Sequence, residues 1–368
     1  MSKTTISPAT RLFTAQLAVY KQLIDADIKQ YSTQLERETL QHFGANARLT
    51  VDTYLSVLAR GGKRIRGSLA ILAYEMCGGH DQDMILQAAR AIEMLHAYIL
   101  MIDDFQDRSA VRRGGPTGHV LLGNYHKRHE LAGDAGHFGA SIAINAALTG
   151  AHAAQQILAN LQVNSDLKLR AIEVINHSMV VTAHGQTNDI INEVVAKVTD
   201  RDIDRVLEWK TAHYTFLNPL TVGMILAGTD NRSIKAIADY AMHAGKAFQI
   251  TDDILGIFGS EFESGKSPMD DIREGKRTLI TAYALEHTAD DNKNFLVQML
   301  GNEHITPVEF ERCKDILTES GALDHAEKEA GKHVVKALQA LEKHPDDWSD
   351  QGVDFLRGLA KSMLHRTA

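Results

Sequence analysis

The chain has 368 residues, a formal net charge of -8, and a composition that is 44% hydrophobic and 23% charged. The acidic excess disfavours a nucleic-acid partner, so an anionic ligand would have to be bound by local groups of basic residues. Two cysteines are too few for a disulfide framework. Only six prolines and 6% aromatic residues favour long helices over an all-β sandwich.

The hydropathy of the chain favours a protein that does not span a membrane. We find no apolar run of the ~20 residues that a membrane span needs. The first residues, MSKTTISPATRLF, lack the long apolar core of a signal peptide. We therefore expect a cytoplasmic protein with no transmembrane segment, in which residues 1–13 form a disordered N-terminal extension.

Helical periodicity of apolar residues runs through most of the chain, and no alternating strand pattern is convincing. In chain order, we expect helices over residues 14–44, 50–61, 64–78, 84–107, 141–161, 166–191, 200–228, 233–258 and 278–287, then peripheral helices from about residue 306. Residues 108–136 and 259–276 are expected as loops that follow Asp-bearing helix ends. Because we find no repeat or linker, one all-α domain over residues 1–368 is the simplest interpretation.

Two acidic motifs each follow an apolar helix. In DDFQD, Asp103 and Asp107 share one helix face, where they repel each other unless a cation lies between them. Mg²⁺ prefers carboxylate oxygens completed by phosphate oxygens. A second pair, Asp252 and Asp253, occurs in FQITDDILGIFG. Each motif alone is nearly as well explained as a solvated helix end, but the two together predict two walls of one metal–phosphate site.

Basic residues lie in separate groups that suit phosphate oxygens. They are Lys63, Arg64 and Arg66 in GGKRIRG; Arg112 and Arg113; Lys210 beside Thr211; and Lys266, Lys276 and Arg277. Glycines before a helix N-terminus let the backbone approach an anion, and arginine offers a planar fork to phosphate. A lone lysine is ordinarily solvated, yet the whole set predicts a diphosphate-bearing substrate whose hydrocarbon tail is enclosed by apolar helices.

Other chemistries lack their residues. We find no defensible Ser–His–acid order, no Cys/His zinc spacing, and neither the GxGxxG nor the Walker glycine pattern of nucleotide sites. His184, His213 and His243 are better interpreted as core or surface histidines than as ligands.

Six motifs, over roughly residues 54–282 and in this order, resemble those of the trans-isoprenyl diphosphate synthases, or polyprenyl synthetases. They are GGKRIRG, HAYILMIDDFQD with RRGGPTGH, HGQTND, KTAHYTF, FQITDDILGIFG and GKSPMDDIREGKRT. The chain is most similar to short-chain geranylgeranyl diphosphate synthases. The resemblance implies an all-α, isoprenoid synthase-type helical bundle around a deep central cavity, a homodimer, and about three Mg²⁺ ions per active site.

The resemblance also implies roles for individual residues. The implied metal ligands are Asp103, Asp104, Asp107, Asp252 and Asp253. The implied contacts of the allylic diphosphate are Arg112, Lys210, Thr211, Gln249, Lys266 and Lys276. The implied metal-free site for isopentenyl diphosphate consists of Lys63, Arg66, His96 and Arg113. Catalysis is expected to depend on Asp103, Asp107, Lys210 and Asp252.

The implied activity is that of a transferase. It joins isopentenyl diphosphate head-to-tail to dimethylallyl, geranyl or farnesyl diphosphate by ionisation, condensation and elimination. The departed diphosphate is the expected proton acceptor, so no side-chain base is required. In this scheme the aspartates and arginines of residues 101–119 face different partners, and we expect no direct pairing between Asp103 or Asp107 and Arg112.

Chain length is implied by the residues just before Asp103. Tyr98 and Ile99 occupy the positions that limit the tail pocket in the family, and one aromatic residue there favours a C20 product over C15. Ile99 falls near the Asp103 face of the helix, whereas Tyr98 points ~140° away, so core packing remains an equal explanation for Tyr98. Gly256 departs from the family pattern, because many members carry a third acid there.

Three alternative functions share part of this pattern. A farnesyl diphosphate synthase differs only in product length. A terpene cyclase would have a different second metal motif and no use for GGKRIRG. A non-catalytic subunit of a heteromeric synthase would often lack the first aspartates, which this chain retains.

Overall fold

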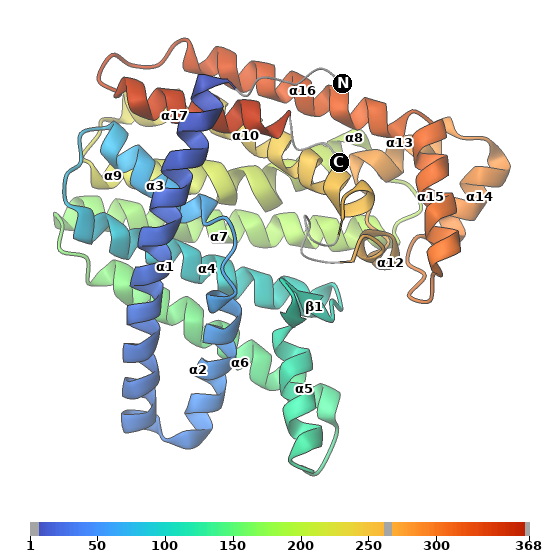
Figure 1. Ribbon diagram of the computed structural model, residues 1–368, viewed down its shortest axis with the longest axis horizontal. Coiled ribbons are helices and arrows are strands. Elements are labelled where there is room, and N and C mark those ends of the chain that lie inside the picture. The colour runs from blue at the N-terminus through green and yellow to red at the C-terminus, as the bar shows by residue number, and fades with distance from the viewer. Residues whose placement is uncertain (1–6, 261–266, 365–368) are drawn as a thin grey trace.

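The computed structural model describes residues 7–260 and 267–364, and these residues are almost entirely helical (Figure 1). The helices are α1 (Pro8–Phe43), α2 (Ala45–Ala59), α3 (Ile65–Met76), α4 (Gln82–Gln106), α5 (Gly118–Arg128), α6 (Ala135–Ala159), α7 (Ser165–Val194), α8 (Asp200–Arg205), the π-helix η1 (Val206–Leu217), α9 (Asn218–Leu226), α10 (Asn231–Phe258), α12 (Asp270–Glu274), α13 (Leu279–His287), α14 (Asp290–Met299), α15 (Pro307–Glu319), α16 (Ala322–Leu341) and α17 (Asp350–Met363). The all-α prediction is confirmed.

Polar N-caps start most of the long helices. Asp81, Asp134 and Asp230 each accept a hydrogen bond from a backbone N–H in the first turn of the helix that follows. The first helix begins earlier than expected: Ser7 caps it, and Pro8 stands at its first position. Residues 8–13, expected in a disordered extension, are therefore helical, and that part of the prediction is wrong.

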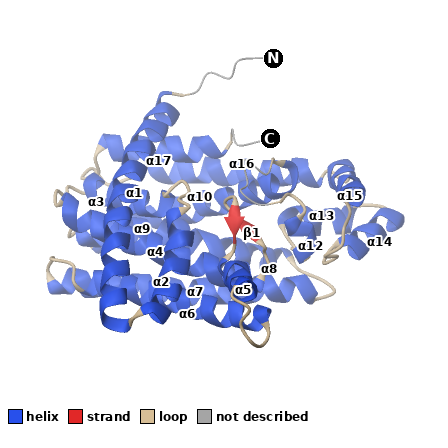
Figure 2. Ribbon diagram, turned by 60° about the horizontal axis from the view of Figure 1, so that its bottom comes forward, coloured by secondary structure: helices blue, strands red, loops and turns tan. Residues whose placement is uncertain are grey.

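Two stretches expected to be simple are composite. The predicted loop 108–136 contains an antiparallel hairpin, β1 (Val111–Arg112) with β2 (Gly115–Pro116), which Figure 2 shows beside the helices, and also α5. The predicted helix 200–228 is divided into α8, η1 and α9. A π-helix is rare and frequently marks a functional position, so its occurrence at residues 206–217 directs attention to this segment.

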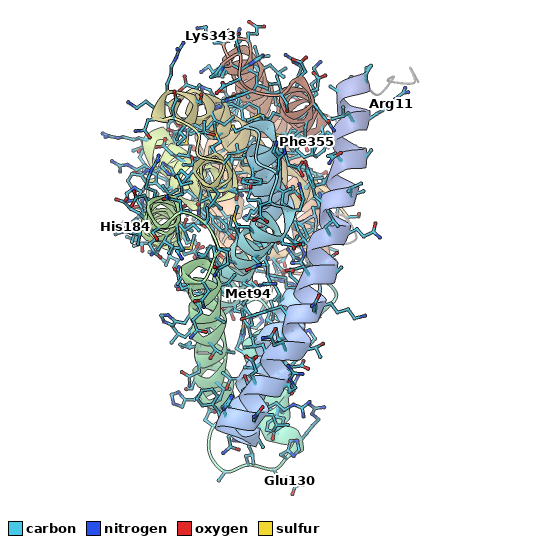
Figure 3. The ribbon with its side chains drawn as sticks, turned by 90° about the vertical axis from the view of Figure 1, so that its left-hand side faces the viewer. Arg11, Met94, Glu130, His184, Lys343 and Phe355 are labelled. Atoms are coloured by element: carbon cyan, nitrogen blue, oxygen red, sulfur yellow. The ribbon has the colours of Figure 1, made fainter. Side chains whose placement is uncertain are left out.

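The helices that matter for the site lie side by side in the centre. α10 packs against α16 and η1, α7 packs against η1 and α9, and α4 packs against α3 and α6. The C-terminal part of α1 extends from this centre with α2, α5 and α6 as an arm, which ends near Glu130 in Figure 3, while Lys343 and Arg11, near the start of α1, lie at the opposite end. The hairpin stands where the arm meets the centre (Figure 1).

Buried apolar side chains form two clusters. The larger draws on α1–α7, η1, α9, α10, α16 and α17, and the smaller joins α8, the start of η1 and the end of α10 with α12–α16. Within the described residues, α4 is long and apolar enough to cross a membrane, but 61% of its most apolar window is buried inside the fold. Its hydropathy is thus accounted for by its place in the core. The single domain and the cytoplasmic location stay predictions.

Candidate active site

One cavity of about 1120 Å³ lies between α4, α7, η1 and α10. It brings together most of the residues singled out in the sequence. These are Lys63, Arg66, His96, Tyr98, Ile99, Asp103, Arg112, Arg113, Lys210, Thr211, Gln249, Asp252, Asp253 and Lys276. Asp104 and Asp107 are buried and are not among the lining residues. Lys266 lies outside the described residues.

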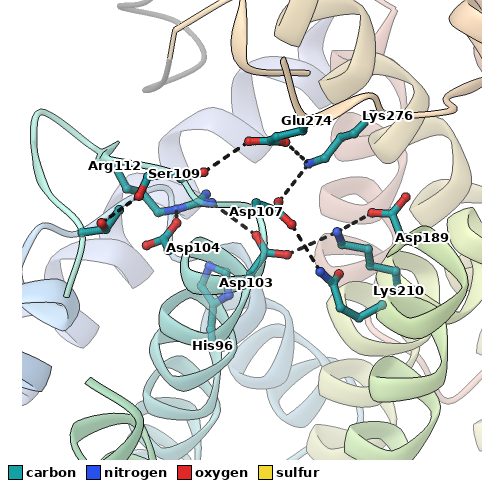
Figure 4. Close-up of polar contacts among 12 residues, drawn as sticks. His96, Asp103, Asp104, Asp107, Ser109, Arg112, Asp189, Lys210, Glu274 and Lys276 are labelled. Carbon is teal, nitrogen blue, oxygen red and sulfur yellow. Dashed lines mark hydrogen bonds and ion pairs between the residues drawn. The ribbon is translucent and has the colours of Figure 1, made fainter. Parts of the chain in front are cut away.

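The end of α4 is held by three cations (Figure 4). Lys210 Nζ lies 3.2 Å from Asp103 Oδ1, and Lys276 Nζ lies 3.1 Å from Asp107 Oδ2. The third cation, Arg112, reaches Asp103 Oδ2 with Nη2 at 3.2 Å and donates from Nε to Asp104. The expectation that Asp103 would not pair with Arg112 is therefore wrong. The hairpin folds back over the helix end, and burial favours pairing between the two charges.

These contacts shift the pKa values of the neighbouring carboxylates Asp103 and Asp104 in opposite directions. Burial alone would raise the pKa of Asp103, but Lys210, Arg112 and Lys276 outweigh it and hold the pKa below its usual range. For Asp104, burial is stronger than the single partner Arg112 and raises its pKa to about 6. Asp103 is therefore the carboxylate kept fully ionised at the cavity wall.

The motif HGQTND contributes two residues that received no role in the sequence analysis. Asp189 Oδ2 accepts a hydrogen bond from Lys210 at 2.7 Å, and Gln186 Nε2 approaches Asp107 at 3.5 Å. Gly185 makes this possible, because a Cβ there would come within 3.0 Å of the Lys210 backbone nitrogen. The signal in the sequence was a glycine followed by an acid one helical turn later, facing the lysine of KTAHYTF.

The second acidic motif is buried on α10. Gln249 joins it to the π-helix, since it accepts from the Thr211 hydroxyl and donates to Asp253 Oδ1 at 2.7 Å. Burial, with the nearby charge of Asp271 second, raises the pKa of Asp253 to about 8. Asp271 comes from α12 and packs directly against Gly256. The space beside Gly256, where the resemblance would place a third acid, is thus occupied by a carboxylate from another helix.

The carboxylates suit a hard cation chemically. Within residues 7–260 and 267–364, no group of three or more His, Cys, Asp or Glu is arranged to hold a metal ion, and Asp103 of the first motif is paired with Lys210 and Arg112. Nevertheless Asp103, Asp252 and Asp253 line one cavity, and Asp104 Oδ2 is a buried oxygen with no hydrogen-bond partner. Oxygen donors of this kind fit Mg²⁺.

The basic residues of GGKRIRG interlock with the hairpin. Arg113, at φ 51°, donates to the Gly61 carbonyl, and its guanidinium would lie 2.7 Å from any Cβ on Gly62. Arg64 has a structural role, because it is 4% exposed and binds Asp25, Glu93 and the Leu58 carbonyl. Arg66 instead reaches His96 Nε2 at 3.2 Å and lines the cavity.

Away from the charged groups, the cavity becomes apolar. Its wall there is made by Tyr98, Ile99 and Ile102 of α4 and by Met179 and Ala183 of α7. Tyr98 and Ile99 both contact the cavity although they point in different directions from the helix axis. A hydrocarbon chain that starts at the carboxylates would run along α4 toward Tyr98.

The fold is all-helical, and its cavity joins carboxylates, cations suited to phosphate and an apolar end. These features are those of an enzyme that acts on amphiphilic diphosphates. The polyprenyl synthetase family model matches residues 48–317, and the chain belongs to this family. It is a prenyltransferase, as the six motifs predicted.

Individual relatives and solved structures are similar to the chain over most of its length. The geranylgeranyl diphosphate synthase of Saccharolobus solfataricus is 31% identical over 82% of this chain and 86% of its own. The geranylfarnesyl diphosphate synthase of Aeropyrum pernix is 31% identical over 79% and 86%. The solved structure of geranylgeranyl pyrophosphate synthase from Corynebacterium glutamicum, complexed with isoprenyl diphosphate and magnesium, superposes with a TM-score of 0.89 at 28% identity, covering 94% of this chain and 98% of that one.

Proposed function

We propose that the protein joins isopentenyl diphosphate to an allylic diphosphate and releases geranylgeranyl diphosphate. The observation that carries this proposal is the order of groups along one cavity. Arg113 lies against the GGKRIRG loop with Lys63 and Arg66 in the same cavity wall, Arg112, Lys210 and Lys276 surround the carboxylates at the end of α4, and the apolar end reaches Tyr98. Two diphosphates and one growing tail fit this order.

The residues divide between the two substrates. Lys210, Lys276 and Arg112 would bind the oxygens of the allylic diphosphate, so each would exchange a carboxylate partner for a phosphate. Lys63, Arg66, His96 and Arg113 would bind isopentenyl diphosphate without metal. Thr211 and Gln249, which are hydrogen-bonded to each other, would also contact the allylic diphosphate. The enclosing helices exclude water, which protects a carbocation from hydrolysis.

Asp103, Asp107, Asp252 and Asp253 would hold Mg²⁺. When bound, Mg²⁺ neutralises diphosphate oxygens and assists their departure as a leaving group. Three ions per site is the number that we propose. Magnesium would also supply the positive charge that Lys210 and Arg112 provide to Asp103 in the structure.

The test is incubation with labelled isopentenyl diphosphate, Mg²⁺ and each of the C5, C10 and C15 allylic diphosphates, followed by measurement of product length. We expect a predominantly C20 product and no product after addition of EDTA. A predominantly C15 or C30-plus product would contradict the C20 assignment. No turnover with any primer would favour the non-catalytic subunit.

We also propose a homodimer. Exposed apolar side chains follow one face of α6, at Ile144 and Leu148, and one face of α7, at Leu169, Val180 and Ile191. Light scattering should give twice the chain mass of 40.6 kDa. Leu148→Lys should lower that mass if the α6 face lies between the two copies, whereas exposed Val308→Lys on α15 should leave it unchanged.

A further inference from the structure

His96 and Tyr214 form a buried pair. The resemblance gives His96 a role in binding isopentenyl diphosphate, but it gives none to Tyr214. Tyr214 lies on the π-helix, is 4% exposed and lines the cavity. Its hydroxyl contacts His96 Nδ1. The other ring nitrogen, Nε2, lies 3.2 Å from Arg66 Nη1, and the Arg66 guanidinium stacks 4.3 Å above the Tyr214 ring. Tyr214 thus contacts two residues of the metal-free site, His96 and Arg66.

The donors in this group fix the tautomer of His96. Guanidinium nitrogens only donate, so Nε2 accepts from Arg66. The proton of a neutral ring must then be on Nδ1, and the Tyr214 oxygen accepts it. The ring is neutral because burial, reinforced by Arg66 and Arg113, holds the pKa of His96 well below its usual range.

When a diphosphate binds at Nε2, this nitrogen must donate a hydrogen bond, whereas it accepts one from Arg66 in the structure. Phosphate oxygens only accept, so a neutral His96 can bind them only with its proton on Nε2. Nδ1 must then accept a hydrogen bond, and the group already in contact with it is the Tyr214 hydroxyl. A hydroxyl can reverse from acceptor to donor by rotation, and few other side chains have this property.

We infer that Tyr214 is a positioning residue of the metal-free diphosphate site, which lets His96 change from the Nδ1–H to the Nε2–H tautomer when isopentenyl diphosphate binds. The Nδ1 proton passes to solvent and a solvent proton joins Nε2, so this exchange of tautomers takes up no net proton. This inference rests on the proposed function. It gives the tyrosine of KTAHYTF a task separate from that of Lys210 and Thr211.

Tyr214→Phe isolates the hydroxyl, because the ring under Arg66 is retained. Titration calorimetry with isopentenyl diphosphate in EDTA measures the metal-free site without turnover. We expect the variant to bind about tenfold more weakly, since Nδ1 would be left without a donor. In steady-state assays the KM for isopentenyl diphosphate should rise by a similar factor, while the KM for the allylic substrate changes by less than about threefold.

A double-mutant cycle shows whether Tyr214 acts through His96. In a His96→Ala background, Tyr214→Phe should change the affinity by less than about twofold. The matched control is Tyr240→Phe, which removes another buried hydroxyl, bonded to the Leu356 carbonyl at 2.8 Å and remote from the cavity. Its affinity for isopentenyl diphosphate should equal that of the wild type.

Unchanged affinity in Tyr214→Phe, or the same loss with and without His96, would overturn the inference. Thermal unfolding of each variant separates a folding defect from a binding defect, and a loss of affinity without a loss of folding supports the inference. If the wild type neither binds isopentenyl diphosphate nor forms product, the proposed function itself fails. If the wild type does both and Tyr214→Phe binds isopentenyl diphosphate as tightly as the wild type, only the inference about Tyr214 fails and the proposed function stands.

Discussion

Gly256 of α10 and Asp271 of α12 are in such close contact that a Cβ on Gly256 would come within 3.0 Å of Asp271 Oδ2. Asp271 thus occupies the space that a side chain at position 256 would need. With Asp271 in its place, position 256 has no room for a carboxylate, and the two helices pack because the residue there is glycine.

Gly256→Ala should force Asp271 to move. We expect the free energy of unfolding to fall by about 1–3 kcal/mol, as measured by urea denaturation, because the added methyl overpacks a buried contact. Adding Asp271→Ala should recover part of this loss. Gly331→Ala on α16 is the control, since only Leu364 lies at 4.0 Å from its new Cβ. Equal effects at positions 256 and 331 would contradict the packing argument.

Asp189→Asn should impair turnover without changing the fold. The carboxylate holds Lys210 Nζ at 2.7 Å, and a neutral amide binds an ammonium less strongly. We expect kcat/KM for the allylic substrate to fall about 10–100-fold, which corresponds to a lost hydrogen bond between charged groups. Glu173→Gln, at an exposed position of the same helix, should behave as the wild type. Wild-type kinetics in Asp189→Asn would show that Lys210 needs no partner on α7.

Tyr98→Ala should lengthen the product. Tyr98 lines the apolar end of the cavity, so its removal opens space in the direction of the tail. Mass spectrometry of products formed from farnesyl diphosphate should show C25 and longer chains. Met179→Ala, on the opposite wall, tests whether α7 shares this limit. An unchanged product spectrum in Tyr98→Ala would assign Tyr98 to packing alone.

His333 should make stability depend on acidity. Burial, with the facing groups His243, Lys246 and Lys336 next, lowers the pKa of His333 from 6.5 to about 4, and Asp204 opposes this weakly. The unfolded chain then binds a proton below about pH 6.5 that the folded chain refuses until about pH 4. The contribution of His333 to the free energy of unfolding is therefore complete above this pH window and is lost as the pH falls through it.

The loss should be about 1 kcal/mol between pH 7 and pH 4.5, because His333 is only partly buried and solvent screens its neighbours. Urea denaturation at both pH values measures it. His333→Gln should flatten the difference relative to the wild type, and His80→Gln, at an exposed loop position, should not. An equal slope in all three proteins would remove His333 as the cause.

Much of the site was predictable because its residues occur in short motifs on helix ends. The placement of Asp103, Lys210, Gln249 and Asp252 around one cavity follows from their motifs and was expected. The π-helix was not, because apolar periodicity does not distinguish it from an α-helix over a single element. Nor was the partner of Arg112, since the fold of the hairpin decides where its guanidinium lies.

Contacts between motifs were the least predictable part. Asp271 stands 15 positions beyond Gly256 along the chain, and only the packing of α12 on α10 reveals that one fills the space left by the other. Asp189 was within a quoted motif, but its role depends on the close approach of α7 to η1 at Gly185. Such approaches are tertiary, and a single sequence does not encode them as a local pattern.

Two consecutive arginines of the hairpin face different parts of the site. Arg112 turns toward the aspartates of α4, whereas Arg113, the next residue, turns toward Gly61 and Gly62. Consecutive Cα atoms are ~3.8 Å apart across a trans peptide, whatever else moves. Under the proposed function, a single peptide bond would therefore link a residue of the allylic diphosphate site to a residue of the isopentenyl diphosphate site. An insertion of one residue between these arginines would shift one of them relative to its own site without removing either arginine.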